Sequence, residues 1–264
     1  MVQPASGGGP DVGAAEIARL LHATTMPPGL IDDLVATAPP LWLMSAPASA
    51  LAGDVVLCHP PLGAGEVRAV VHGASGGMSR VTVVGTDRPG FLADSAAVMA
   101  DAGLSIASAS AASWPGHELA LHTLMAKVDH LWPVEWEAVG ERLRSVAAGN
   151  GIAVDFAPKG SAQVGCAAPA PGQRLLTVSA PDQVGLLWAL CRWLADHDFS
   201  VEAAHLDGAA GRAEGSLLIS GDGNVSGLEA HLGGRSDGHS RNVVETLIQG
   251  PAAALRGLRR VLAR

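Results

Sequence analysis

Two short turns, 95 residues apart, carry the residues of this chain that are best placed to do chemistry. The first is Asp-Arg-Pro-Gly at residues 87–90, and the second is Asp-Gln-Val-Gly at residues 182–185. Each turn follows an apolar run that predicts a strand and precedes an apolar, amphipathic run that predicts a helix. The free N–H groups at the start of such a helix, at the positive end of its dipole, can bind the carboxylate of a small molecule.

A purely structural role explains the same turns. Asp87 and Asp182 can cap the helices that follow them, and Pro89 presets the first helical dihedral angle. The glycine of each turn lets the chain pass close to a neighbouring backbone or a ligand. Because a capped turn needs no ligand, spacing alone favours the structural role and leaves the binding role open.

Other reactive side chains do not form a recognisable catalytic or metal site. His117, His122 and His130 flank a predicted hairpin at spacings that do not place three ligands on one face, so we expect solvated or core histidines. A nucleophile could be sought at Cys191 or Ser179, but neither lies in a Gly-x-Ser-x-Gly elbow or beside an identifiable base. We therefore expect no enzyme activity, no metal and no cofactor.

The elements that position the first turn follow from the hydrophobic pattern. The first copy predicts a strand at 81–84, a helix at 89–102, strands at 105–113 and 118–128, a helix at 135–147 and a strand at 151–156. A further strand at 65–73 is expected to pair with the first of these as a hairpin. The order βαββαβ is the split βαβ of a ferredoxin-like α+β sandwich, in which two helices cover one face of a four-stranded antiparallel sheet.

The second copy and the flanking segments complete the predicted organisation. The second copy predicts a strand at 174–179, helices at 184–196 and 228–232, and strands at 200–206 and 214–220, followed by a strand at 243–248 and a terminal helix at 251–262. The expected divisions are a disordered N-terminus at 1–13, a short helical segment at 14–64, a first domain at 65–157, a linker at 158–172 and a divergent second domain at 173–264. Such small units expose strand edges, so we expect their sheets to pair, within the chain or between chains.

Composition excludes several classes of function. The net charge of −8 and the absence of a dense basic patch argue against a nucleic-acid partner. No run of about 18 apolar residues could span a bilayer and the first residues lack a signal peptide's features, so we expect a cytoplasmic protein without membrane contact. The three cysteines are widely spaced, which favours ordinary reduced thiols over disulfides.

The two copies resemble the ACT domain, a ferredoxin-like module that senses amino acids. The resemblance lies in Asp-Arg-Pro-Gly-Phe-Leu at 87–92 after a Val-rich strand, an apolar helix ending near Gly103, and then Leu-Ser-Ile at 104–106. It covers about 80–156 well and 174–220 moderately, with Asp182 and Gly185 retained. With Pro-Pro-Leu-Trp-Leu-Met-Ser at 39–45, the chain is also similar to the C-terminal regulatory region of the bacterial PII-protein uridylyltransferase family, whose tandem ACT region responds to glutamine. The catalytic motifs of that family have no counterpart here.

The resemblance implies a ligand site at each turn. The residues that it carries over as ligand-facing are Asp87, Pro89, Gly90, Phe91 and Leu92 in the first copy, and Asp182, Gly185, Leu186 and Leu187 in the second. The glycines would admit the ligand, the backbone amides after them would meet its carboxylate, and the aspartates would receive its ammonium group.

The function implied is a non-catalytic regulatory sensor of nitrogen metabolism that binds an amino acid such as glutamine through two tandem ferredoxin-like ACT domains. Its partners would be that small molecule and either a second copy of the chain or a regulated protein. The alternative is an assembly module that mediates protein–protein interaction without a ligand.

Overall fold

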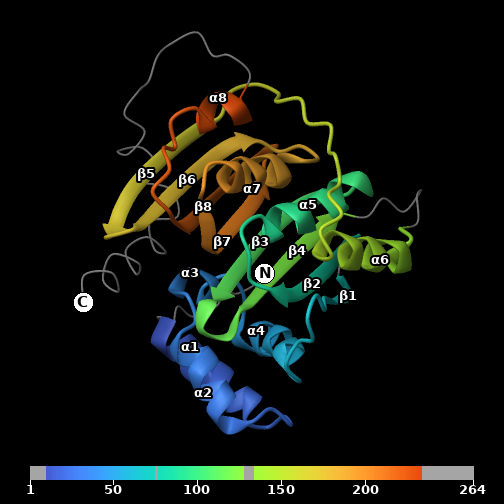
Figure 1. The fold of residues 1–264 in the computed structure, drawn as a ribbon, viewed down its shortest axis with the longest axis vertical. Helices are drawn as coiled ribbons and strands as arrows, with labels where there is room; N and C mark the ends of the chain where they lie inside the picture. The colour runs from blue at the N-terminus through green and yellow to red at the C-terminus, as the bar shows by residue number, and fades with distance from the viewer. Residues whose placement is uncertain (1–9, 75–76, 128–133, 234–264) are drawn as a thin grey trace, which may run out of the picture.

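An eight-stranded antiparallel sheet runs through the molecule (Figure 1). The computed structural model describes residues 10–74, 77–127 and 134–233. The strands are β1 (Arg68–Ala74), β2 (Met78–Thr86), β3 (Ser105–Trp114), β4 (Leu119–Lys127), β5 (Gln163–Ala170), β6 (Gln173–Pro181), β7 (Ser200–Ala209) and β8 (Arg212–Ser220). They lie in the order β1-β2-β4-β3-β7-β8-β6-β5. The expected mixture of helices with an antiparallel sheet is therefore confirmed.

Two halves of the sheet repeat one order of elements. The first half contains β1, β2, α5 (Phe91–Asp101), β3, β4 and α6 (Trp136–Ala147). The second contains β5, β6, α7 (Leu186–Asp196), β7, β8 and α8 (Leu228–Leu232). The helix and the hairpin expected after each turn are present within a few residues of the predicted bounds.

The two halves meet where β3 pairs with β7, a contact that we call the seam. The pairing is antiparallel and joins Ser108 to Asp207 at one end and Ala112 to Ala203 at the other. At its centre Ser110 pairs with His205. These two residues hold equivalent positions in the two copies, 95 residues apart. The halves are therefore related by an approximate two-fold axis through this pair, and the expected pairing of sheets occurs within the chain.

The predicted fourth strand of the first half, at 151–156, is wrong. Residues 151–156 form neither strand nor helix, and β1 occupies the place beside β2. A hairpin partner just before β2 closes a much shorter loop than one that must return after α6, and short loops cost less entropy to close. The apolar side chains of Val154 and Phe156 instead lie against Gly185 of the second turn.

Two further expectations need correction. Strand β5 lies inside the segment 158–172 that was expected to be a linker, and it takes the place in the second half that β1 has in the first. It is an edge strand with Pro169 near its end, a position that tolerates proline. Helix α1 (Pro10–Leu21) begins inside the expected disordered segment 1–13. The strand expected at 243–248 and the helix expected at 251–262 lie outside the described residues.

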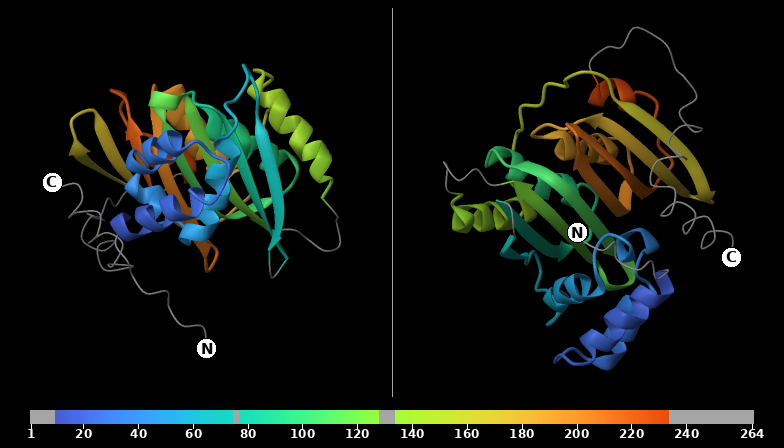
Figure 2. Two further views of the ribbon diagram at one scale, coloured as in Figure 1. Left: turned by 90° about the horizontal axis from the view of Figure 1, so that it is seen from below. Right: turned by 180° about the vertical axis from the view of Figure 1, so that it is seen from behind.

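Helices α5, α6, α7 and α8 lie on one face of the sheet and enclose the larger core (Figures 1 and 2). Apolar side chains at alternate strand positions, such as Val81 and Val83 of β2, meet the apolar faces of these helices. Helices α5 and α7 also contact each other. The two turns are thus held near the seam, each within reach of the other half.

The opposite face of the first half is covered by the N-terminal helices α1, α2 (Pro28–Ala36), α3 (Pro40–Leu43) and α4 (Ala48–Val55) (Figure 2). Trp42 of α3 meets Trp114 of β3 edge to face, with ring centroids 5.4 Å apart. The buried carboxylate of Asp54 in α4 accepts hydrogen bonds from Arg80, Thr82 and Thr123 of the sheet. Helix α3 contacts both β3 and β7, so this layer spans the seam.

Among the described residues, we find no helix with the length and apolar character needed to cross a membrane.

Candidate functional site

Both turns have the same backbone geometry, and it explains their glycines. Gly90 and Gly185 immediately precede α5 and α7, with φ angles of 81° and 86°. These values lie in the left-handed region, which glycine adopts at no steric cost. The expectation that the aspartates cap the helices is wrong, because neither helix has a side-chain cap hydrogen bond. The carboxylates of Asp87 and Asp182 are therefore not used as helix caps.

The first turn of each helix presents unpaired amides. In α7, the N–H of Leu186 bonds to the carbonyl of Gln183 and the N–H of Ala189 bonds to Gly185, at 3.2 and 2.9 Å. Within the part of the chain that the structure describes, the N–H groups of Leu187 and Trp188 between them have no acceptor. The corresponding amides of α5, at residues 92 and 93, are in the same state. Unpaired amides at a helix start form a site for an anion.

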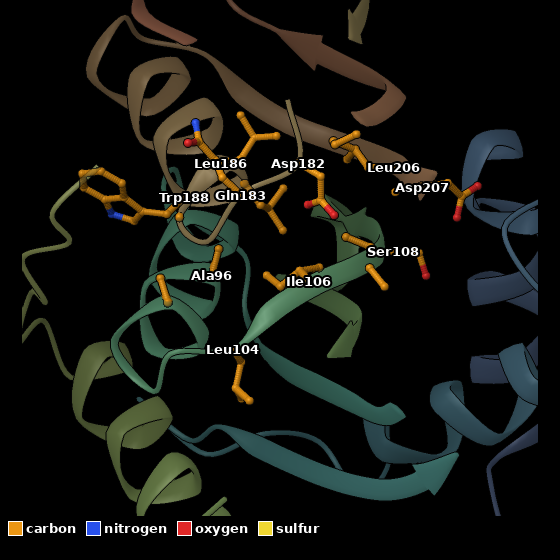
Figure 3. A pocket seen from close by; sticks show the side chains of 17 residues that line it. Ala96, Leu104, Ile106, Ser108, Asp182, Gln183, Leu186, Trp188, Leu206 and Asp207 are labelled. Carbon is orange, nitrogen blue, oxygen red and sulfur yellow. The ribbon is translucent and has the colours of Figure 1, made fainter. Parts of the chain in front are cut away.

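A pocket opens in front of the α7 amides, and we call it the α7 pocket (Figure 3). It encloses about 460 Å³ of empty space, including the space at its mouth. Its lining residues come from both halves: Ala96, Ala100, Leu104, Ile106, Ala107, Ser108 and Ala109 from the first, and Asp182, Gln183, Gly185, Leu186, Leu187, Trp188, Leu206, Asp207, Gly208 and Ala213 from the second. The wall is thus mostly aliphatic, with a few polar groups.

Asp182 lies five residues before Leu187 in the sequence, and its side chain extends toward Ile106 and Ser108 of β3 (Figure 3). Lys127 approaches it at 3.8 Å. Gly208 leaves the carboxylate room, since an added Cβ there would lie 3.3 Å from Asp182 Oδ2 and 3.0 Å from a backbone oxygen. The pocket therefore offers a carboxylate beside two amide donors.

Gln183 and Asp207 are further polar residues that line the α7 pocket. Gln183 Nε2 is buried and has no hydrogen-bond partner among the described residues. His205 Nε2 lies 3.0 Å from Asp207, and its hydrogen bond lowers the pKa of that carboxyl. Gln183 thus has an unused donor close to the second turn.

The first turn forms a smaller pocket, the α5 pocket, whose empty space is about 310 Å³ including the space at its mouth. It is lined by Asp87, Arg88, Gly90, Phe91, Leu92, Ala93, Ser113 and His122 of the first half and by Cys191, Phe199 and Val201 of the second. Most of these residues are the 95-residue counterparts of residues that line the α7 pocket. The approximate two-fold axis therefore relates the two pockets, and each is closed by the other half.

The polar groups of the α5 pocket are more fully paired. Ser113, the counterpart of Gly208, donates to Asp87 at 3.2 Å, and burial raises the pKa of the Asp87 carboxyl. Arg88 is held by Asp94 at 2.5 Å and by the carbonyl of Val146 at 3.2 Å. Burial raises the pKa of the Cys191 thiol to about 12, so this thiol stays protonated.

His122 is the most deeply buried polar group of the α5 pocket. Its exposed fraction is 3% and its Nδ1 lies 3.2 Å from Ser95 Oγ. Burial, and secondarily the positive charge of Arg88, lower its pKa to about 3. The imidazole is therefore neutral at physiological pH.

The structure brings most of the expected site residues together. Asp87, Gly90, Phe91 and Leu92 line one pocket, and Asp182, Gly185, Leu186 and Leu187 line the other, whereas Pro89 lines neither. The residues supplied across the seam were not predicted from the sequence, and no role was assigned to His122. The 95-residue repeat is the signal that could have related the two walls, once a pairing of the halves was assumed.

Comparisons with known proteins give little likeness. No protein-family model matches the chain, and no curated protein matches it. Among solved structures, it is similar to aspartate kinase from Synechocystis, with 17% identity and a TM-score of 0.36, over 66% of this chain and 27% of that chain. It is also similar to an unknown protein from Galdieria sulphuraria, with 17% identity and a TM-score of 0.22, over 59% of this chain and 83% of that one. The chain thus spans about a quarter of the aspartate kinase chain.

Proposed function

We propose that this chain is a non-catalytic regulatory sensor that binds an α-amino acid, such as glutamine, in tandem ACT-like halves. The observation that carries the proposal is the matched pair of pockets at the seam. Each pocket places an aspartate and two unpaired helix amides of one half against the apolar wall of the other. The aspartate is complementary to the ammonium group of a free amino acid, and the two amides are complementary to its carboxylate.

The α7 pocket supports this chemistry in detail. The amides of Leu187 and Trp188 are donors for a carboxylate at the positive end of the helix dipole. Asp182 is an acceptor for an ammonium group. The aliphatic wall, which includes Leu104 and Ile106, would cover the rest of a small side chain.

The reactive groups near the pockets support a role without turnover. Cys191 is buried and held in its neutral form by burial. Ser95 and His122 approach each other, but Ser95 is fully buried and its hydroxyl also bonds to the carbonyl of Phe91 at 3.1 Å. A nucleophile would need both access and a free proton acceptor beside it.

Regulation would follow from the way each pocket is built. A ligand held by one half and covered by the other binds most tightly in one mutual arrangement of the halves, and so shifts the population toward it. Coupling of this kind is typically about 1–3 kcal/mol. Helix α3 contacts both strands of the seam on the opposite face. It is therefore in position to transmit a change in the arrangement of the halves to the other N-terminal helices.

The test is a thermal-shift screen of the full chain against the twenty L-amino acids. A ligand that binds only the folded state at a hundred times its dissociation constant stabilises by about 2.7 kcal/mol. We expect a shift with glutamine or a close relative and its loss in an Asp87→Asn, Asp182→Asn double variant. Asp33→Asn, at an exposed aspartate of α2 that lines neither pocket, is the matched control. A cooperative transition that no amino acid shifts would favour the assembly module.

A further inference from the structure

His122 breaks the symmetry of the two halves. It pairs with Val83 of β2, and at the corresponding place in the second half Gly215 pairs with Val178 of β6. No side chain could be added to Gly215 without rearrangement, since a Cβ would lie 2.6 Å from the Leu206 side chain and 2.5 Å from the carbonyl oxygen of His205. His122 therefore lines the α5 pocket, whereas in the second half the Leu206 side chain lies against Gly215 and lines the α7 pocket.

The contacts of Ser95 favour one tautomer of His122. Ser95 Oγ lies 3.1 Å from the carbonyl oxygen of Phe91 and 3.2 Å from His122 Nδ1. Both contacts are hydrogen bonds at once when the hydroxyl of Ser95 donates to the Phe91 carbonyl and His122 Nδ1–H donates to Ser95 Oγ. In that tautomer Nε2 is an acceptor. Within the described residues Nε2 has no hydrogen-bond donor.

The ring itself is held firmly. The Phe91 ring lies against it, with centroids 4.7 Å apart, and Phe91 in turn occupies the space that Gly85 leaves free. The other titratable groups that line the pocket are Asp87, Arg88 and Cys191. Burial, and secondarily the positive charge of Arg88, lower the pKa of His122, so the ring remains neutral.

We infer that His122 Nε2 is the specificity-determining acceptor of the α5 pocket, selecting an amino acid whose side chain ends in an N–H or O–H donor, as a carboxamide does. This inference rests on the proposed function, which holds the main-chain groups of the ligand at the turn. An apolar side chain seated against the ring would leave a buried acceptor unpaired, whereas a carboxamide would satisfy it. The expected preference is on the order of ten- to a hundredfold in Kd. The aliphatic α7 pocket lacks this acceptor.

The binding test uses the full chain carrying Asp182→Asn, which disables the α7 pocket. Calorimetry with L-glutamine and with L-methionine, its near-isostere without a donor, measures the preference of the α5 pocket. We expect glutamine to bind ten- to a hundredfold more tightly, and His122→Leu in the same background to abolish the preference. His72→Gln, at an exposed histidine on β1, should leave it unchanged.

A second measurement covers the case in which His122→Leu does not fold. Long-range ¹H–¹⁵N correlation spectra of the full chain at pH 7 should show the Nδ1–H tautomer of His122. Replacing Ser95 with alanine should release that tautomer and reduce the preference for glutamine. An Nε2–H tautomer or a charged ring in the parent protein would overturn the inference.

The outcomes separate the two proposals. If the parent chain binds no amino acid at all, the proposed function fails. If the parent binds amino acids but the Asp182→Asn chain binds none, or its preference survives the loss of His122, the inference about His122 fails while the sensor stands.

Discussion

The two halves share one order of strands and helices and differ in how fully the polar groups around their turns are hydrogen-bonded. In the first half, Asp87 is bonded to Ser113 and Arg88 to Asp94, and the opposite face of the sheet carries α1 to α4. In the second half, Gly208 replaces Ser113, and the amide nitrogen of Gln183 has no hydrogen-bond partner among the described residues. The repeated turn thus sets where a ligand would bind, and the residues around it set how selectively.

The largest effect should come from the layer that distinguishes the first half. Asp54→Ala removes the buried acceptor of Arg80, Thr82 and Thr123 and leaves a positive charge largely buried without its partner. We expect a loss of about 3 kcal/mol in the free energy of unfolding, measured by urea denaturation. Glu16→Ala, which removes an exposed pair with Arg19, should leave the free energy of unfolding almost unchanged. Equal losses for the two variants would mean that α4 is not held by this cluster.

The next largest loss of stability should come from Gly215, which holds the position in the second half that His122 holds in the first. Gly215→Ala brings a methyl group to 2.5 Å from a backbone oxygen, and we expect a loss of about 2–3 kcal/mol. Gly53→Ala in α4, where nothing lies within 4 Å, should be neutral or stabilising by up to about 1 kcal/mol. A tolerated Gly215→Ala would show that the second half has room for a side chain and that the difference at His122 is not steric.

The pH dependence of stability should also differ between the halves, because only the first buries a histidine at this place. The folded pKa of His122, about 3, lies below the unfolded value of 6.5, so the unfolded chain binds more protons between these values. Stability should therefore be complete above pH 6.5 and fall as the pH drops toward 3. Relative to His122→Gln, the parent should lose about 2 kcal/mol between pH 7 and pH 5 in urea unfolding. Parallel pH profiles would show that His122 is not buried in neutral form.

The smallest effect tests the difference between the two aspartates. Gly208→Ser places a hydroxyl beside Asp182, as Ser113 stands beside Asp87, and should weaken amino-acid binding at the α7 pocket about tenfold. Calorimetry of the full chain measures this change. Ser216→Ala on β8, outside both pockets, should not alter binding. Unaltered binding in Gly208→Ser would mean that a hydroxyl beside Asp182 does not affect amino-acid binding at the α7 pocket.

The strands and helices next to the two turns could be predicted because their apolar residues recur at strand and helix periods. Val81 and Val83 alternate toward the core, and the glycine before each helix marks its start. The segment at 151–156 has the same alternation, but its apolar side chains cover the second turn rather than a sheet. Strand β5 has a weak pattern, with Pro169 and several alanines, because an edge strand buries little.

Only the wall of each pocket that belongs to its own turn and helix could be predicted from the sequence. The wall across each pocket depends on the register of β3 against β7, which no local pattern encodes. His122 was expected to be a solvated or core histidine, and the structure places it in the core. Its significance depends on Ser95 and Phe91, whose contacts with it are tertiary.

The pairing of Ser110 with His205 at the seam has a consequence for how this molecule can change over evolutionary time. In a dimer of identical chains, every residue near the two-fold axis occurs twice, so a substitution alters both pockets together. Here the two sides of the axis are encoded separately, and serine already faces histidine at its centre. Joining the halves in one chain therefore allows one pocket to acquire a new selectivity while the other keeps its own.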